Sequence, residues 1–321
     1  MQAHEVFIGV DVAKSTLSSC IHGLHSPQDF GNDEASIRNW LAKLPAQAAI
    51  AVESTGRHHL LLVGLAHASG RRAFVLNARD VYFYAKALGV RGKTDRTDAQ
   101  IIARYLAEHH DSLRQWVPGT AAQQRLQELL RCRAGVTTKR MSLRQVLRDV
   151  PGLDAAVGHL EQQFDELLEQ IDAQVAALVA QDTHLSQGCA ALRTITGFGP
   201  QGSAMLTALL SRVQFTNADA LVAYSGLDPR PNDSGTKTGR RRISKRGSPE
   251  LRRQLYLAAF AASHSKALGP LYRSIKAKGF KPTQALVILA RKLLRIAWAV
   301  WKTGKPFNPS LLALPPACAK T

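Results

Sequence analysis

The run V-F-I-G-V-D-V at residues 6–12 decides how the first third of the chain folds. Its apolar and β-branched composition predicts a buried strand, and the run T-L-S-S-C-I-H at residues 16–22 has the composition of a second strand. Asp11 interrupts the first strand near its end, where an ionised carboxylate is costly without a partner. We therefore expect this strand to deliver one acidic side chain to a specific task.

Outward from this strand, apolar runs and helical patterns alternate up to about residue 112. Further strands are expected near 29–31, over 48–53 and over 72–77. Helices are expected over 35–44, 57–69, 81–88 and 95–109. This alternation predicts an α/β unit with a mixed sheet and helices on its faces.

Four acidic residues in this region follow an order that suits metal-dependent phosphodiester chemistry: Asp11, Glu53, Asp95 and Asp98. Glu53 ends an apolar run, and the two aspartates of K-T-D-R-T-D-A lie three apart at a helix start, so both point to one side. Carboxylates from separate segments can converge on Mg²⁺, with Mn²⁺ as a substitute. Alternatively they are surface acids that cap helices, with Asp95 as an N-cap.

The composition favours a nucleic-acid or anionic-membrane partner. The 321 residues include 42 Lys and Arg against 24 Asp and Glu, a formal net charge of +18. No apolar run reaches the roughly 18 residues of a membrane-spanning helix. A signal peptide is not expected, because a basic segment followed by an apolar one is missing near residue 1. Cys20, Cys132, Cys189 and Cys318 are far apart, which fits reduced thiols in a cytosolic protein better than a disulfide framework or a zinc site.

The middle of the chain predicts long helices. Apolar residues recur every three or four positions in Q-R-L-Q-E-L-L-R-C-R at 124–133 and in the segment 160–178, and Pro151-Gly152 interrupts the pattern. These helices form either an antiparallel pair or an oligomerising coiled coil. We expect three domains, at 1–112, 113–186 and 187–321, the last of them built mainly from short helices.

Two segments of the last third suit phosphate binding. In T-G-F-G-P at 196–200, Gly197 and Gly199 open a helix and can present backbone N–H groups to a phosphate, as in a helix-hairpin-helix contact. The alternative is a plain tight turn. From Arg230 to Arg253 nine basic residues stand against two acids, which is typical of DNA-backbone contacts. The candidate contacts are Lys237, Arg240, Arg241, Arg242, Lys245, Arg246, Arg252 and Arg253.

Ser234 lies inside this basic loop, directly before Gly235. A serine hydroxyl is a poor nucleophile unless a base, a metal or nearby cations activate it, and the loop supplies cations. Ser234 is therefore a candidate nucleophile. Alternatively, it only contacts a phosphate.

Taken together, these motifs resemble the IS110-family transposases, a group that includes pilin-gene invertases. The resemblance rests on motifs in the same order along nearly the whole chain. They are I-G-V-D-V-A-K (8–14), V-E-S-T-G (52–56), K-T-D-R-T-D-A (93–99), I-T-G-F-G-P (195–200), A-Y-S-G-L-D-P-R (223–230), S-G-T-K-T-G-R-R-R-I-S-K-R-G (234–247) and L-R-R-Q-L-Y-L-A-A (251–259). One departure is Thr196, where members commonly have proline; its absence frees φ and loosens the turn.

The resemblance implies a RuvC-like, RNase H-type first domain whose D-E-D-D metal site corresponds to Asp11, Glu53, Asp95 and Asp98. It implies a serine nucleophile at Ser234 in a mainly helical C-terminal transposase domain, after a coiled-coil linker. It also implies a structured bridge RNA that pairs with donor and target DNA. The expected assembly is a dimer to tetramer, in which the acids of one subunit meet the serine of another.

The predicted function is site-specific DNA recombination through a covalent serine–DNA intermediate. The energy of the broken bond is conserved, so no ATP is needed, and the chain contains no G-x-x-x-x-G-K-[ST] motif. One alternative is a RuvC-like endonuclease that hydrolyses branched DNA with metal-activated water. The other is a non-catalytic nucleic-acid scaffold, in which the four acids only cap helices.

Overall fold

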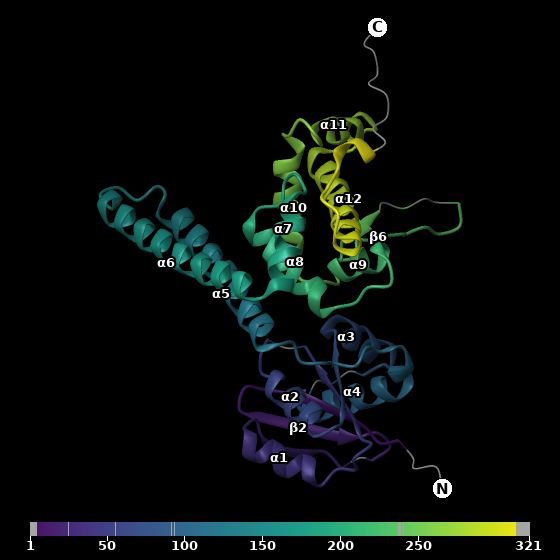
Figure 1. Ribbon diagram of the computed structural model, residues 1–321. Coiled ribbons are helices and arrows are strands. Elements are labelled where there is room, and N and C mark those ends of the chain that lie inside the picture. The colour runs from purple at the N-terminus through teal and green to yellow at the C-terminus, as the bar shows by residue number, and fades with distance from the viewer. Residues whose placement is uncertain are drawn as a thin grey trace. The chain divides into compact units, whose positions relative to one another are not determined.

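The computed structural model describes residues 5–24, 26–54, 56–90, 92, 94–236, 239 and 241–312. The chain forms two compact units, Met1–Pro118 and Gly119–Thr321 (Figure 1). Each unit has its own hydrophobic cores. The three-domain division remains a prediction.

The first unit is built on a mixed five-stranded sheet of order β3-β2-β1-β4-β5, which confirms the predicted fold class. The strands are β1 (Phe7–Val12), β2 (Thr16–Ile21), β3 (Gln28–Gly31), β4 (Ala49–Glu53) and β5 (Arg72–Leu76). β1 pairs antiparallel with β2 and parallel with β4, and β4 pairs parallel with β5. The carboxyl ends of β1, β4 and β5 therefore meet at one edge of the sheet.

Both faces of this sheet are covered, because alternate residues of each strand point to opposite sides. Ile8, Val10, Ile50 and Val52 belong to the same core as α1 (Glu34–Ala42) and α2 (Leu60–Ala68). On the other face, Ala49, Ala51 and Phe74 pack with α3 (Ala78–Ala87) and α4 (Asp95–His109). The helix predicted over 57–69 begins later, at Leu60, after a turn.

Helix α4 begins with a capping box between Thr94 and Thr97. The Thr94 hydroxyl accepts from the Thr97 amide, and the Thr97 hydroxyl accepts from the Thr94 amide. Thr94, not Asp95, is therefore the N-cap, and the reading of Asp95 as a cap is wrong. The single turn η1 (His110–Ser112) follows the helix.

The second unit begins with two long antiparallel helices, α5 (Ala121–Leu147) and α6 (Asp154–Gln181), as the periodicity predicted. Figure 1 shows them side by side, reaching away from the other helices of their unit. Arg133 of α5 donates to both carboxylate oxygens of Asp172 on α6, at 2.6 and 2.9 Å. Towards the turn, Arg140 bridges Glu161 and Asp165.

The remaining helices surround one large core. They are α7 (Thr183–Arg193), α8 (Pro200–Arg212), α9 (Ala218–Ser225), α10 (Pro249–Ser263), α11 (Gly269–Ala277) and α12 (Pro282–Thr303), with a final turn η2 (Pro309–Leu311). A two-stranded hairpin of β6 (Pro229–Arg230) and β7 (Arg242–Ile243) lies between α9 and α10. These helices are mainly short, as expected, and α12 is longer, with 22 residues that carry a continuous apolar face.

No helix in the described part of the chain has the length and apolar character needed to cross a membrane.

Candidate active site

Asp11 and Glu53 occupy neighbouring positions at the carboxyl edge of the sheet. The parallel register pairs Val10 with Val52, so the next residues on the two strands are Asp11 and Glu53. Adjacent strands are about 4.8 Å apart, which places the two residues side by side. Asp11 is two residues after Gly9, and Glu53 is two residues after Ala51, so each lies on the same sheet face as that residue. This is the face covered by α4. Both are half-buried.

Helix α4 crosses β1 in direct backbone contact. A Cβ atom on Gly9 would lie 2.2 Å from both the amide nitrogen of Ala103 and the carbonyl oxygen of Ala99. Asp98 immediately precedes Ala99 in α4 and is half-buried. Glycine at residue 9 is thus the condition for the close approach that brings Asp98 to β1.

The direction of α4 places its first turn at the same edge as Asp11. At the far end of the helix, the ring of His110 lies 4.7 Å from that of Phe7 at the start of β1. At the near end, Arg96 pairs with Asp29 at 3.4 Å. Asp29 in turn lies in the cross-strand row Asp11–Ser18–Asp29. The N-terminal turn of α4 therefore lies over the row that contains Asp11.

This row holds a second, well-bonded carboxylate. The Ser18 hydroxyl donates to Asp29 at 2.6 Å, and this hydrogen bond together with Arg96 keeps the pKa of Asp29 below its ordinary value. Asp29 already has these two partners. It was missed from the sequence, because its pairing depends on the register of three strands.

The carboxylates suit a hard divalent cation by donor type, since such ions prefer oxygen ligands. The fold brings Asp11, Glu53 and Asp98 to one edge, and Asp95 is exposed one turn before Asp98. Within the described residues, however, no three His, Cys, Asp or Glu side chains are already close enough to hold a metal ion. The backbone thus places the acids together without gathering their carboxylates into a cluster.

Ser234 is exposed on the loop between β6 and β7 of the second unit. The neighbouring Asp233 closes this loop: it accepts from the Gly239 amide at 3.0 Å and from Arg241 at 2.7 Å. The bond from Arg241 holds the pKa of Asp233 below its ordinary value. A Cβ on Gly239 would lie 1.8 Å from the Asn232 carbonyl oxygen, so this crossing requires glycine. Sequence reasoning missed Asp233 and Gly239.

The base of the hairpin is fixed by buried contacts. Ser244 is 2% exposed, and its hydroxyl hydrogen-bonds the Asp228 carboxylate, while its amide donates to the Asp228 carbonyl at 2.9 Å. Gly247 packs on the backbone of α9, since a Cβ there would lie 2.0 Å from the Tyr224 carbonyl oxygen. The hairpin therefore stands on a rigid base and carries Ser234 at its exposed end.

The predicted nucleic-acid contacts divide by their surroundings. Arg242, Lys245 and Arg246 are exposed on the hairpin. Arg252 is half-buried and donates to the carbonyl oxygens of Ser225 and Gly247, and burial lowers its pKa. The remaining candidates have these outcomes: Arg241 pairs with Asp233, Arg253 pairs with Glu250 at 3.5 Å, and Lys237 and Arg240 lie outside the described residues.

The T-G-F-G turn joins α7 to α8. Gly197 has a φ of +102°, and a Cβ there would lie 2.3 Å from the Ala258 carbonyl oxygen of α10. Phe198 is buried in the core, and Gly199 is the N-cap of α8 without a side-chain hydrogen bond. Gly197 is thus required for packing, whereas Gly199 leaves the first amides of α8 without a side-chain cap.

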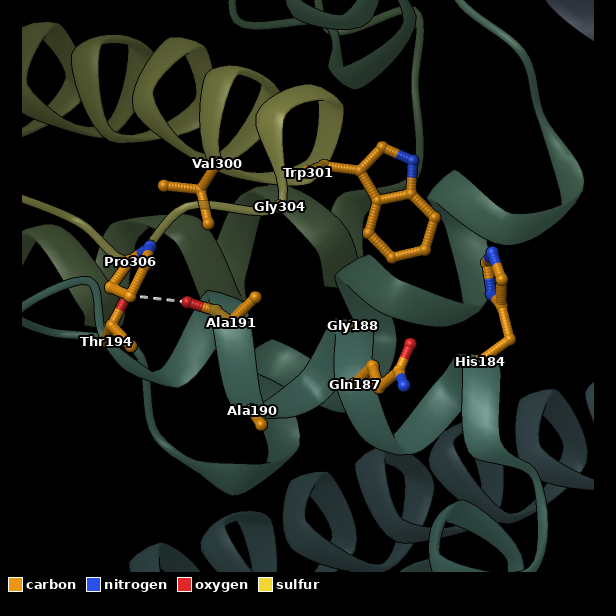
Figure 2. Close-up of a pocket in the computed structure, with 10 residues that line it drawn as sticks. All are labelled: His184, Gln187, Gly188, Ala190, Ala191, Thr194, Val300, Trp301, Gly304 and Pro306. Atoms are coloured by element: carbon orange, nitrogen blue, oxygen red, sulfur yellow. Dashed lines mark hydrogen bonds between the residues drawn. The ribbon is translucent and has the colours of Figure 1, made fainter.

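A pocket lies elsewhere in the second unit. Figure 2 shows it between α7 and α12, with His184 and Trp301 at one end and Thr194 and Pro306 at the other. Its volume is about 570 Å³ and its lining is mostly apolar. The Thr194 hydroxyl donates to the Ala191 carbonyl at 2.6 Å. The rings of His184 and Trp301 meet edge-on, with centroids 5.4 Å apart. Among the described residues, none of the predicted site residues lines this pocket, and its lining includes no carboxylate.

Both halves of this arrangement match known transposases. Residues 8–151, which contain the four acids, match a DEDD class described as transposase, and residues 189–273, which contain Ser234, match the Transposase IS116/IS110/IS902 family. The chain belongs to the IS110 family of transposases. This family assignment confirms the predicted resemblance and the RNase H-like first unit.

Curated relatives of this IS110-family chain agree. It is 27% identical to the pilin gene-inverting protein of Moraxella bovis over 95% of this chain and 98% of that protein. The corresponding protein of Moraxella lacunata is 26% identical over the same shares. An uncharacterized 43.6 kDa protein of insertion element IS110 from Streptomyces coelicolor is 30% identical over 57% of this chain and 48% of its own length.

The IS110-family chain is therefore an enzyme that acts on DNA, a transposase with recombinase activity. Its DEDD class also implies the use of a divalent metal ion.

Proposed function

We propose that this transposase cleaves and rejoins DNA at specific sites through a covalent bond between Ser234 and a DNA phosphate. The observation that carries this proposal is the placement of Ser234: it is exposed at the end of a cationic hairpin whose base is buried and bonded. A nucleophile needs a fixed position and nearby charge to act on a phosphodiester. The hairpin supplies both.

In the first step the Ser234 oxygen attacks the scissile phosphorus. A serine–phosphate bond forms, the bond to one DNA oxygen breaks, and that oxygen leaves as a hydroxyl after taking up a proton from solvent. The serine proton passes to solvent in turn. After strands exchange, a DNA hydroxyl attacks the phosphoserine and releases the serine. One phosphoester replaces another in each step, so no external energy source is required.

The acidic edge of the first unit would hold the metal, through Asp11, Glu53 and Asp98, with Asp95 one turn away. When bound, Mg²⁺ would neutralise charge on the phosphoryl oxygens. Arg242, Lys245 and Arg246 neutralise phosphates beside the serine. The acids and the serine occupy separate units. The family resemblance implies that the acids of one subunit meet the serine of another.

The proposal includes a bridge RNA and a homo-oligomer. A guide RNA explains how one protein would select donor and target sites without a side-chain code for either. The high positive charge supports binding of both nucleic acids. The homo-oligomer is what the family resemblance implies.

The deciding experiment is trapping of the covalent adduct. Native protein is incubated with donor and target DNA, Mg²⁺ and the RNA that co-purifies with it, then denatured and digested. We expect a DNA-linked peptide that contains Ser234, no adduct with Ser234→Ala, and an unchanged adduct with Thr236→Ala, the exposed hydroxyl two residues away. An adduct that persists in Ser234→Ala would overturn the proposal. Cleavage without any adduct would instead support the hydrolytic endonuclease.

A further inference from the structure

Helix α3 presents two bare aromatic rings on one face. Arg79, Tyr82, Phe83 and Lys86 follow the spacing i, i+3, i+4 and i+7, which places them on one side of a helix. The side chains of Tyr82 and Phe83 are 56% and 54% exposed and meet edge-to-face, with centroids 5.4 Å apart. We call these four residues the α3 aromatic face.

The aromatic face is not part of the core. The opposite side of α3 packs on the sheet and α4 through Val81, Tyr84 and Ala85. The Tyr84 hydroxyl donates to Glu108 of α4 at 2.5 Å, and its ring meets that of Tyr105 at right angles. Helix α3 is thus held by one side, and its position does not depend on Tyr82 or Phe83. Two large rings in water need another explanation.

Cations flank both rings. The Arg79 guanidinium lies 5.5 Å from the centroid of Phe83, and the Lys86 ammonium lies 5.6 Å from that of Tyr82. An apolar partner surface would have to bury these charges at considerable cost. A polyanion with flat, apolar groups matches both features, since phosphates pair with the cations and bases stack on the rings. That description fits an unpaired nucleic-acid strand.

The aromatic face begins at the acidic edge. Leu76 of β5 pairs in register with Glu53, and its carbonyl accepts from the Ser54 amide at 2.9 Å. Asn77, the next residue, is the N-cap of α3. Tyr82 and Phe83 therefore lie about 7–9 Å along the helix axis from Asn77, at a rise of 1.5 Å per residue. A strand held by its phosphate beside Glu53 reaches these rings within a few nucleotides.

We propose that the α3 aromatic face stacks unpaired bases of the DNA strand that enters the acidic site. Duplex DNA offers no free base faces, so the aromatic face selects a strand that is already opened or displaced. This inference rests on the proposed function for the position of the scissile phosphate, whereas stacking itself requires no catalysis.

The test is equilibrium binding by the full-length protein of a short oligothymidylate that carries one 2-aminopurine, whose fluorescence falls when it stacks. The variants are Tyr82→Leu and Phe83→Leu, which keep apolar bulk but lose the ring. We expect each to weaken strand binding about 5- to 150-fold and to abolish the quenching. Tyr82→Phe, which keeps the ring, is expected to bind like the wild type.

Two controls separate stacking from other effects. Phe260→Leu removes a ring of 52% exposure from α10, and we expect no change in strand binding. Binding of a duplex of the same length is expected to change less than about twofold in any of these variants. Wild-type strand affinity in the leucine variants would overturn the inference. So would an equal loss on strand and duplex, or a change in oligomeric state by light scattering, since the latter would identify a protein interface.

The inference and the proposed function fail in different ways. Asp11→Asn is expected to lose cleavage and keep the 2-aminopurine quenching. If the leucine variants bind normally while Asp11→Asn is inactive, the stacking inference is wrong and the proposed acidic site stands. If Asp11→Asn still cleaves while the leucine variants lose the strand, the acidic-site proposal is wrong and the stacking surface stands.

Discussion

Gly9 of β1 lies directly against the backbone of Ala103 of α4, where an added Cβ would be 2.2 Å from the amide nitrogen. This contact sets the distance between the central strand and the helix that carries Asp98. Asp11 is two residues from Gly9 on the same face, so the same contact controls how close Asp11 and Asp98 come. Gly9, which has no side-chain functional group, thus determines the geometry of the acidic site.

Replacing Gly9 tests this dependence. Gly9→Ala forces α4 away from the sheet, and we expect a loss of about 1–3 kcal/mol of unfolding free energy, the range for overpacked cores. DNA cleavage should fall more than stability explains, because Asp98 moves. Urea denaturation and a cleavage assay measure the two effects. Gly64→Ala in α2 is the matched control: nothing lies within 4 Å of its Cβ, so it should be neutral or slightly stabilising.

The proposed metal site can be tested by replacing two of its acids. We expect Asp11→Asn and Asp98→Asn to lower metal-dependent cleavage at least about 100-fold, because each removes a charged ligand. In a thermal melt, Mg²⁺ should raise the Tm of the wild type and leave that of both variants unchanged. A chelator should abolish wild-type cleavage, and added Mg²⁺ should restore it. Equal Mg²⁺ stabilisation of wild type and both variants would contradict the site.

The loop closure at Asp233 should be required for Ser234 to react. Gly239→Ala places a Cβ against the Asn232 carbonyl, and we expect at least about tenfold slower adduct formation with an unchanged melt, since the loop is exposed. Asp233→Asn keeps an acceptor for the Gly239 amide and loses only the charge. Its effect should be smaller than that of Asp233→Ala. Adduct formation at the wild-type rate in Gly239→Ala would show that the loop is not positioned by this crossing.

Tyr84 predicts a pH dependence at alkaline pH. Burial, together with the hydrogen bond and charge of Glu108, raises its pKa from 10.0 to about 12. A raised folded-state pKa means that the neutral phenol stabilises the fold below pH 10 and that this contribution is lost between pH 10 and 12. Tyr84→Phe should remove that part of the decline, as seen in unfolding free energies measured across the window. A decline identical to that of the wild type would exclude Tyr84 as its source.

Two arginines of the basic segment should behave differently on mutation. Arg242→Gln removes an exposed charge, so the slope of log affinity for DNA against log salt should become shallower by about 1. Arg252→Gln removes hydrogen bonds to Ser225 and Gly247, and we expect a loss of about 1–3 kcal/mol of stability with little change in the slope. The reverse pattern would contradict the structural assignment of Arg252.

Much of the fold could be predicted because it depends on local patterns. The strands near Asp11 and Glu53 and the helix at Asp95 follow from apolar periodicity and from the residues that end each run. The long pair α5 and α6 follows from its repeat. The length of α12 was not anticipated, although its buried residues follow the spacing of one helical face. The N-cap position was also missed, because Thr94 and Asp95 are both suitable caps and only the hydrogen bonds distinguish them.

For the candidate site, too, some features follow from the sequence and others only from the tertiary structure. The sequence by itself determined which residue types are available: oxygen ligands at four positions, the hydroxyl of Ser234 among cations, and an excess of positive charge. These are properties of composition and order, which no folding step changes. Only the tertiary structure decided that Asp11 lies beside Glu53, that Asp29 is occupied by Ser18 and Arg96, and that Arg252 serves the backbone. Such contacts join residues far apart in the chain, so they depend on strand register and helix packing rather than on local sequence.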